Sequence, residues 1–159
     1  MAEQHKPSAN VGVSVLVKRG DSILLEKRAN VHGAGTWGPP SGHIDYGEIP
    51  ELTAERETLE ETGVTITNII FNCVTNDVFD TEKKHYITLW FEADYKMGEP
   101  LVKSPKEESE VGWFPWNALP QPLFLPFKHF VEGKTYRSTA TQERFVQADS
   151  PSRESSGMV

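Results

Sequence analysis

The chain has a single cysteine and no long apolar run. Cys73 is the only cysteine in 159 residues, which excludes an intrachain disulfide. It lies in an apolar stretch from Ile69 to Val74, which favours a buried and unreactive thiol. No stretch approaches the ~18–20 apolar residues of a membrane span, and the N-terminal residues lack the apolar region of a signal peptide. We therefore expect a cytoplasmic protein without a membrane partner.

Positive charge is also scarce. The chain carries 16 Lys and Arg against 23 Asp and Glu, a net charge of −7. General nucleic-acid binding needs a basic stripe, so this balance argues against it. An anionic ligand would have to be attracted by local cations, meaning a bound metal or a few basic side chains. At this length, with 37% hydrophobic residues, we expect one globular domain.

Strand-like segments interleaved with helical ones predict an α/β fold, with a mixed sheet between helical layers. We divide the chain into a flexible N-terminus (1–9), one domain (10–135) and a polar, partly disordered tail (136–159). The expected strands cover 11–17, 23–28, 37–46, 64–78 and 85–95, the expected helices cover 50–63 and 122–132, and a hydrophilic loop at 96–109 precedes a short turn-helix at 115–119.

The helix expected over 50–63 has clear ends. Pro50 suits the first helical position and Gly63 suits the C-terminal stop. Ile49 would then be the N-cap, which is a poor choice worth roughly 1 kcal/mol against Ser or Asp. We expect Leu52 and Leu59, one heptad apart, to hold the helix by packing on its inner face.

The same helix gathers three glutamates near its C-terminus. Glu60 and Glu61 follow Glu57 by three and four positions, which places all three on one face. Like-charged pairs cost roughly 0.2–0.5 kcal/mol each, and the negative end of the helix dipole adds a further cost. A helix built only for stability would carry Lys or Arg here. Hard oxygen ligands are what Mg²⁺ or Mn²⁺ requires, so the pattern predicts a phosphate-handling metal site.

The spacing around these glutamates resembles the Nudix box. The pattern is Gly, five residues, Glu, seven residues, then Arg-Glu-x-x-Glu-Glu-x-Gly and an apolar residue, and it runs from Gly42 to Val64. Two positions depart from the pattern: Thr58 replaces a bulky aliphatic residue, and Ser41 replaces a second glycine. Neither is a ligand position. The fixed positions are filled by Gly42, Glu48, Arg56, Glu57, Glu60, Glu61 and Gly63.

The resemblance implies a fold, a cofactor and a reaction. The fold is the Nudix α/β/α sandwich, with the box as a loop–helix–loop. The reaction is attack of water on phosphorus in a nucleoside diphosphate derivative, with Mg²⁺ (or Mn²⁺ as a substitute) neutralising the phosphates. The direct ligands would be Glu57 and Glu61, with Glu60 close behind and the carbonyl of Gly42 as a further ligand. Glu48 and Arg56 would form a structural ion pair that supports the catalytic box.

Other candidates lie outside the box. Glu107 and Glu108 occupy a loop where family members often place another metal-binding acid, with plain surface charge as an equal alternative. The general base is either Glu61, through a metal-bound water, or an acid outside the box. Arg28 is expected to contact substrate phosphate rather than form a structural ion pair, and Trp37 could equally stack on a base or lie in the core. His5, His32 and His129 are expected to be ordinary polar residues.

Softer motifs resemble the MutT-like nucleoside triphosphate diphosphatases of the same family. They lie at Gly33–Trp37, His85–Thr88 and Trp113–Trp116. This resemblance implies hydrolysis of an NTP or dNTP to the monophosphate and pyrophosphate, and a possible homodimer. The alternatives are hydrolysis of an NDP-sugar, ADP-ribose or another nucleoside diphosphate derivative, and a non-catalytic module that senses a nucleotide.

Overall fold

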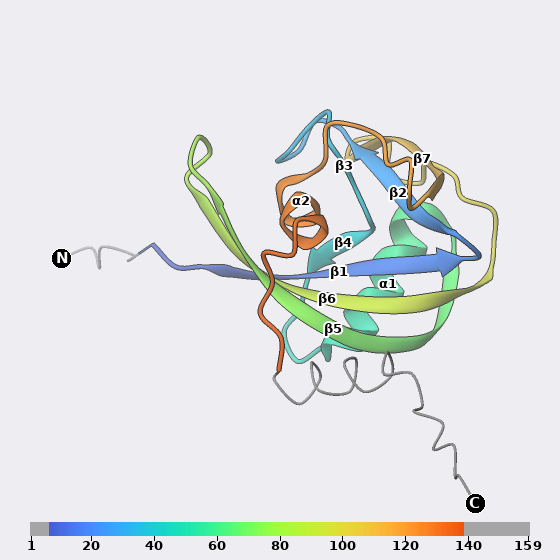
Figure 1. Cartoon of the computed structure of the whole chain (residues 1–159), viewed down its shortest axis with the longest axis horizontal. Helices are drawn as coiled ribbons and strands as arrows, with labels where there is room; N and C mark the ends of the chain where they lie inside the picture. The colour runs from blue at the N-terminus through green and yellow to red at the C-terminus, as the bar shows by residue number, and fades with distance from the viewer. Residues whose placement is uncertain (1–6, 139–159) are drawn as a thin grey trace, which may run out of the picture.

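A computed structural model describes residues 7–138, which form one curved sheet and two helices (Figure 1). The predicted polar tail lies almost entirely outside the described residues. Within them, no helix is both long and apolar enough to cross a membrane. The elements are β1 (Asn10–Arg19), β2 (Ser22–Arg28), β3 (Trp37–Gly38), β4 (Ser41–His43), α1 (Pro50–Thr62), β5 (Thr65–Phe79), β6 (Lys84–Met97), β7 (Glu108–Pro115) and α2 (Leu125–Val131).

The sheet is mixed, in the order β3-β2-β1-β6-β5. β1 runs parallel to β6 and antiparallel to β2. β1 and β2 pair beside their turn, where Lys18 faces Ile23. Further along, β1 pairs instead with β4, which places Gly42 opposite Val13. β7 pairs with β2 on its other side. The strands therefore separate at one end of the sheet, and the β4–α1 segment begins there.

Alternation along β1 explains why one helix covers each face of the sheet. Val13 and Val15 pack in one buried cluster with Ala54 of α1. Leu16 packs in a second cluster with Phe127 of α2. Successive side chains on a strand point to opposite faces, so the two clusters lie on either side of the sheet. Figure 1 shows α2 in front of the sheet and α1 behind it, which confirms the predicted α/β/α arrangement.

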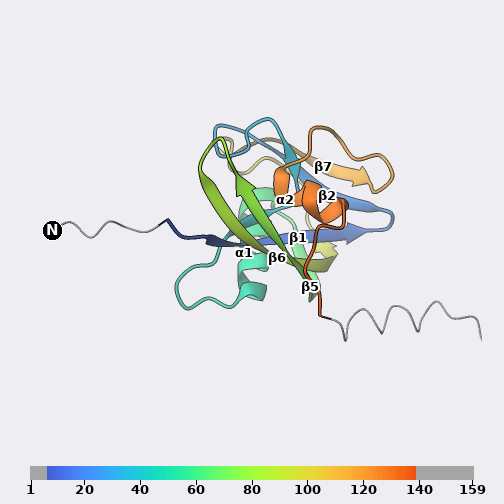
Figure 2. The same ribbon diagram turned by 60° about the vertical axis from the view of Figure 1, so that its left-hand side comes forward.

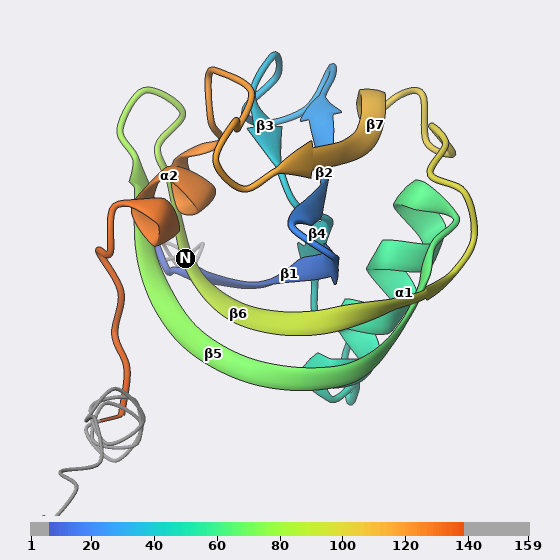
Figure 3. The same cartoon turned by 45° about the vertical axis from the view of Figure 1, so that its right-hand side comes forward.

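β5 and β6 form a long curved hairpin that reaches both helices. Figure 3 shows the pair running from beside α2 to beside α1. The tip of this hairpin approaches the loop between β2 and β3 (Figure 2), where His32 Nδ1 lies 3.4 Å from Glu82 Oε2. Cys73 of β5 is fully buried, and burial raises the pKa of its thiol to about 11. The predicted burial of the thiol is confirmed, and the raised pKa favours low reactivity.

The prediction for the inner face of α1 was wrong. Leu52 and Leu59 are 52% and 42% exposed, whereas Thr58 and Thr62 are fully buried. The threonine hydroxyls bond back to the helix: Thr58 Oγ1 donates to Ala54 O at 2.7 Å, and Thr62 Oγ1 to Thr58 O at 2.6 Å. Their polar atoms are thereby satisfied without a partner on the sheet. The face of α1 that packs on the sheet can therefore carry small threonine side chains in place of leucines. This explains why Thr58 can replace the bulky aliphatic residue that the box usually has.

The ends of α1 agree with the prediction. Pro50 is the first helical residue, and Gly63 adopts a left-handed φ of 75° while its N–H bonds Leu59 O. Ile49 is the N-cap and makes no side-chain capping bond. Glu48 Oε2 instead accepts the hydroxyl of Thr53 at 2.6 Å, so the first turn is tied by the residue before the cap.

The segment after β6 differs in detail from the prediction. β7 begins at Glu108, inside the expected hydrophilic loop, and it ends at Pro115. The expected turn-helix at 115–119 is a turn. The second helix is present but shorter than expected, at Leu125–Val131, with Phe127 fully buried. These short elements are placed by pairing with β2 and by packing on the sheet, which local sequence does not encode.

Candidate active site

A cleft of about 510 Å³ opens between the β4–α1 segment and the segment leading into α2. Two groups of side chains line it, which we call its acidic end and its aromatic end. The acidic end comprises the carboxylates of Glu26, Glu57, Glu61 and Glu107, and the aromatic end comprises aromatic rings with basic side chains beside them. The residues of the second end include Arg28, His32, Lys84, Tyr86 and Phe124.

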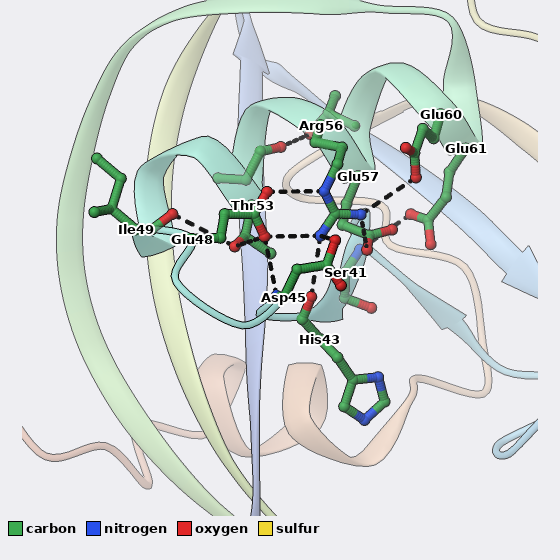
Figure 4. A network of polar contacts seen from close by, with 12 residues as sticks. Ser41, His43, Asp45, Glu48, Ile49, Thr53, Arg56, Glu57, Glu60 and Glu61 are labelled. Atoms are coloured by element: carbon green, nitrogen blue, oxygen red, sulfur yellow. Dashed lines mark hydrogen bonds and ion pairs between the residues drawn. The ribbon is translucent and has the colours of Figure 1, made fainter.

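Arg56 is the hub of the box (Figure 4). Its guanidinium makes two parallel contacts with Glu48, Nε to Oε1 at 2.8 Å and one terminal nitrogen to Oε2 at 2.9 Å. It also bonds the carbonyl of His43 at 3.1 Å, which fixes β4 to the helix. Hydrogen bonds from Arg56 and Thr53 lower the pKa of Glu48 to about 2. The predicted structural ion pair of Glu48 and Arg56 is therefore present.

Glu57 lies directly against the backbone of Gly42. A Cβ atom built on Gly42 would overlap the carboxyl group of Glu57, so a larger residue fits only if the Glu57 side chain moves. The other side of the Glu57 carboxylate faces Arg56, with Oε1 accepting a hydrogen bond at 2.8 Å. Burial raises the pKa of Glu57, and Arg56 opposes that rise. The glycine is required by this close approach, because a side chain there would displace Glu57.

Glu61 is 7% exposed and accepts the backbone N–H of Ser41 at 3.1 Å. Burial holds its pKa well above the ordinary value, and the carboxylates of Glu26 and Glu57 raise it further. Glu26, on β2, is 3% exposed, and its own pKa is raised by burial and by Glu108. Within the described part of the chain, one carboxylate oxygen of each of Glu26 and Glu108 is buried without a hydrogen-bond partner. This end of the cleft crowds carboxyl groups together, and the opposing effect of Arg28 on Glu26 and of Arg56 on Glu57 does not prevent their pKa values from rising.

The predicted metal residues divide into two groups. Gly42, Glu57, Glu61 and Glu107 line the cleft. The Glu60 side chain is 58% exposed and bonds Arg56 at 3.3 Å, and Glu108 is buried at 1% exposure behind the lining. Over residues 7–138, no three His, Cys, Asp or Glu side chains already stand in a metal-holding arrangement. Arg56 accounts for part of this, since it binds Glu57 and Glu60, two of the three glutamates predicted to hold the metal.

The two candidates expected at the substrate have different positions. Arg28 lines the cleft, donates from Nε to His32 O at 2.7 Å, and lies with its guanidinium carbon 4.2 Å from the centre of the Phe124 ring. Trp37 is 8% exposed and packs edge-on against Phe114 at 4.9 Å in the core. It is not among the residues that line the cleft. Of the two alternatives for Trp37, the geometry favours the core residue.

The aromatic end was missed by sequence reasoning. The ring of His32 meets Phe79 edge-on at 3.9 Å and stacks on Tyr86 at 5.7 Å, while Phe79 lies 5.7 Å from Phe124. These rings come from the β2–β3 loop, both strands of the hairpin and the segment before α2. No local pattern links them, and His32 was treated as an ordinary polar residue. The motif His85–Thr88 lies on β6, the strand that contributes Tyr86, but it did not predict that the Tyr86 ring would line the cleft.

The fold and the cleft define a domain of the NUDIX type, and comparison with known proteins supports this. A family model described as the NUDIX domain matches residues 8–134. The chain belongs to the NUDIX hydrolase superfamily.

Among curated proteins, this chain is 34% identical over 118 residues to a protein named NAD-capped RNA hydrolase NudC from Yersinia pestis (strain Pestoides F). The match covers 74% of this chain and 43% of the relative, so the chain spans less than half the length of the curated relatives it matches. The same identity and coverage hold for the protein of that name from Yersinia pseudotuberculosis.

Two solved structures place the fold. The MutT NUDIX hydrolase from Burkholderia pseudomallei superposes with a TM-score of 0.75 at 32% identity, covering 79% of this chain and 98% of that one. The NUDIX domain of Shewanella oneidensis NrtR, solved with ADP ribose, gives a TM-score of 0.66 at 21% identity, covering 91% of this chain and 94% of that one. The second likeness concerns the fold alone.

Proposed function

We propose that this chain hydrolyses a phosphoanhydride bond of a nucleotide in the cleft described above. The observation that carries the proposal is the intact box: the three helix glutamates, the Glu48–Arg56 pair and the close approach of Glu57 to Gly42. A non-catalytic module would not need to keep a cluster of buried carboxylates that burdens the fold. The similarity to a MutT NUDIX hydrolase supports the same reaction class.

The acidic end fits a divalent cation, for which Nudix hydrolases generally have a requirement. The unpartnered buried oxygens of Glu26 and Glu108 and the raised pKa of Glu61 are what a missing positive charge would leave behind. Glu57 and Glu61, with the carbonyl of Gly42, would hold Mg²⁺ or Mn²⁺ there, and Glu107 and Glu60 are the further candidates. A bound divalent ion would neutralise phosphate charge and lower the pKa of water.

The remaining residues have roles beside that ion. Glu61 is the acid best placed to take a proton from water, because it is buried, lines the cleft and is held by the N–H of Ser41. Arg28 provides a fixed positive charge for phosphate, since its Nε is anchored to the carbonyl of His32. Glu48 and Arg56 orient the box rather than react.

For the substrate, we propose a nucleoside (deoxy)triphosphate cleaved to the monophosphate and pyrophosphate. The aromatic end of the same cleft supports this, because planar rings with cations beside them suit a base and its phosphates. The alternatives are dinucleotides and nucleoside diphosphate derivatives, including NAD, ADP-ribose and NDP-sugars. They are favoured by the likeness to relatives named NAD-capped RNA hydrolase, of which this chain spans 43%. A homodimer and a cytoplasmic location stay predictions, as does the absence of general nucleic-acid binding.

The test is a panel of these compounds with Mg²⁺ and with Mn²⁺, read by released phosphate products. We expect pyrophosphate from at least one NTP or dNTP, and its loss when EDTA is added. Glu57→Gln and Glu61→Gln should lose turnover while thermal unfolding shows a folded protein. If no member of the panel is hydrolysed with either metal, the proposal fails; turnover of the dinucleotides alone would replace the substrate assignment.

A further inference from the structure

A buried polar network lies beneath the aromatic end of the cleft, and nothing in the proposed chemistry uses it. Asp77 of β5 is fully buried. Its Oδ2 accepts the hydroxyl of Thr75 at 2.8 Å and that of Thr88 at 2.6 Å, and its Oδ1 lies 2.8 Å from Nδ1 of His129 on α2. Trp90 completes the network by donating from Nε1 to Thr75 at 2.9 Å.

Thr88 is the member of this network that lines the cleft. A hydroxyl has one hydrogen to donate and two lone pairs that accept. The hydrogen of Thr88 is committed to Asp77, and the short distance of 2.6 Å indicates a firm bond. Thr88 can therefore meet a ligand in the cleft only as an acceptor.

The other partners of Asp77 hold this polarity in place. A carboxylate only accepts hydrogen bonds, so Nδ1 of His129 carries the proton in its contact with Asp77. Thr75 does not release Thr88 from its bond to Asp77, because both hydroxyls donate to the same carboxylate. With donors from two strands and one helix, the carboxylate has no freedom to turn away from Thr88.

We propose that Asp77 is a positioning residue that sets the hydrogen-bonding polarity of the cleft floor, so that the site selects ligands presenting an N–H group to Thr88. This inference rests on the proposed nucleotide-binding function of the cleft. The ligand class is a nucleotide whose base carries an amino group, in preference to the analogue that lacks it. A site that offers a fixed acceptor leaves it unpaired when the ligand lacks a donor, which weakens binding.

The test uses two pairs of nucleoside monophosphates, each differing by one amino group: GMP with IMP, and AMP with purine riboside monophosphate. Affinities are measured by calorimetry on the full chain. We expect the amino-bearing member of at least one pair to bind about tenfold more tightly, the ratio of one good hydrogen bond. Thr88→Val should bring that ratio to about one, and Thr88→Ser should retain it.

Asp77→Asn is the sharper variant, because an amide can donate to Thr88 and free its hydroxyl to act as a donor. The ratio should fall to about one or invert, while Asp94→Asn, an exposed aspartate on β6, should leave it unchanged. If Asp77→Asn does not fold, the affinity ratios of Thr88→Val and Thr88→Ser test the proposal without it. Equal affinity within both pairs, no binding of any of the four, or a ratio that survives Thr88→Val overturns the proposal. Selective binding without hydrolysis of any nucleotide would support it while refuting the hydrolase proposal.

Discussion

The two ends of the cleft are built on opposite principles. At the acidic end, like charges crowd together, and two buried carboxylate oxygens have no hydrogen-bond partner among the described residues. At the aromatic end, the rings pack against one another and the polar atoms of the underlying Asp77 network are paired. The ring nitrogens of His32 at this end are also buried without a hydrogen-bond partner among the described residues. The main difference between the ends is therefore charge: an added cation would stabilise the crowded carboxyl groups of the acidic end, whereas the aromatic end is held by the packing of its rings.

Glu61→Gln should have the largest effect on activity, and it tests the role of the crowded carboxyl groups at the acidic end. The amide keeps the acceptor for the N–H of Ser41 but loses the charge. We expect kcat to fall more than about 100-fold, beyond what the loss of an outer-shell partner causes. The metal-free protein should become more stable at pH 8, since a buried charge has been removed. Steady-state kinetics and thermal unfolding in EDTA measure the two effects.

The matched control for this variant is Glu55→Gln, on the exposed face of the same helix. It should change neither activity nor unfolding temperature. An active Glu61→Gln enzyme, or one that is destabilised without metal, would contradict the account of the acidic end.

Arg56→Lys comes next and tests how the acidic end is held together. Lysine cannot reproduce the two parallel contacts with Glu48 together with the bond to His43 O. We expect kcat/KM to fall about 10- to 100-fold, with the protein still folded. The control is Arg19→Lys, which should have full activity. The guanidinium carbon of Arg19 lies 4.5 Å from the centre of the Tyr95 ring. Equal activity of the two variants would show that the paired hydrogen bonds from Arg56 to Glu48 are not needed for activity.

Phe124→Leu should have a smaller effect and addresses the aromatic end. Phe124 lies beneath Arg28 and beside His32, with centroids 5.8 Å apart for the two rings. Loss of base stacking is worth roughly 1–3 kcal/mol, so KM should rise about tenfold with kcat little changed. Phe71→Leu, on the outer face of β5, should alter neither constant. A fall in kcat rather than a rise in KM would place Phe124 in the chemistry.

The sequence predicted the acidic end far better than the aromatic end. The box is contiguous, so its spacing and the stops at Pro50 and Gly63 fixed a helix that the structure reproduces. The inner face was predicted wrongly, because Leu52 and Leu59 satisfy the hydrophobic pattern while Thr58 hides its hydroxyl in the helix backbone. Side-chain bonds of that kind are invisible to an apolar periodicity.

The aromatic end could not be predicted because its members are distant in sequence. His32, Tyr86 and Phe124 meet only when the hairpin curls over the β2–β3 loop. One local signal was present: Thr75 and Asp77 are polar residues on the inward side of a strand-like run. Buried polar side chains need partners, so an alternating polar pair within a core strand indicates a network, although not its partners.

The last expected effect is on stability rather than activity: the acidic end should make the free energy of unfolding decrease with rising pH. The folded-state pKa of Glu26 is about 8, against an ordinary 4.5. Between these values the native state binds more protons than the unfolded state, so the free energy of unfolding decreases as pH rises. Each such proton contributes at most about 1.4 kcal/mol per pH unit. The unfolding temperature in EDTA should therefore fall from pH 5 to pH 8, and less steeply in Glu26→Gln.

Glu48, which lies in the box, provides the opposite pH dependence. Its pKa is lowered to about 2 by Arg56, so its contribution to the free energy of unfolding is present above its unfolded pKa and is lost as pH falls towards 2.

Added Mg²⁺ should raise the unfolding temperature more at pH 8 than at pH 5, because the carboxylates it would bind are then deprotonated. A slope unchanged by Glu26→Gln, or an equal effect of Mg²⁺ at both pH values, would mean that the crowded carboxylates do not burden the metal-free fold. The contrast between the two ends would then rest on geometry alone.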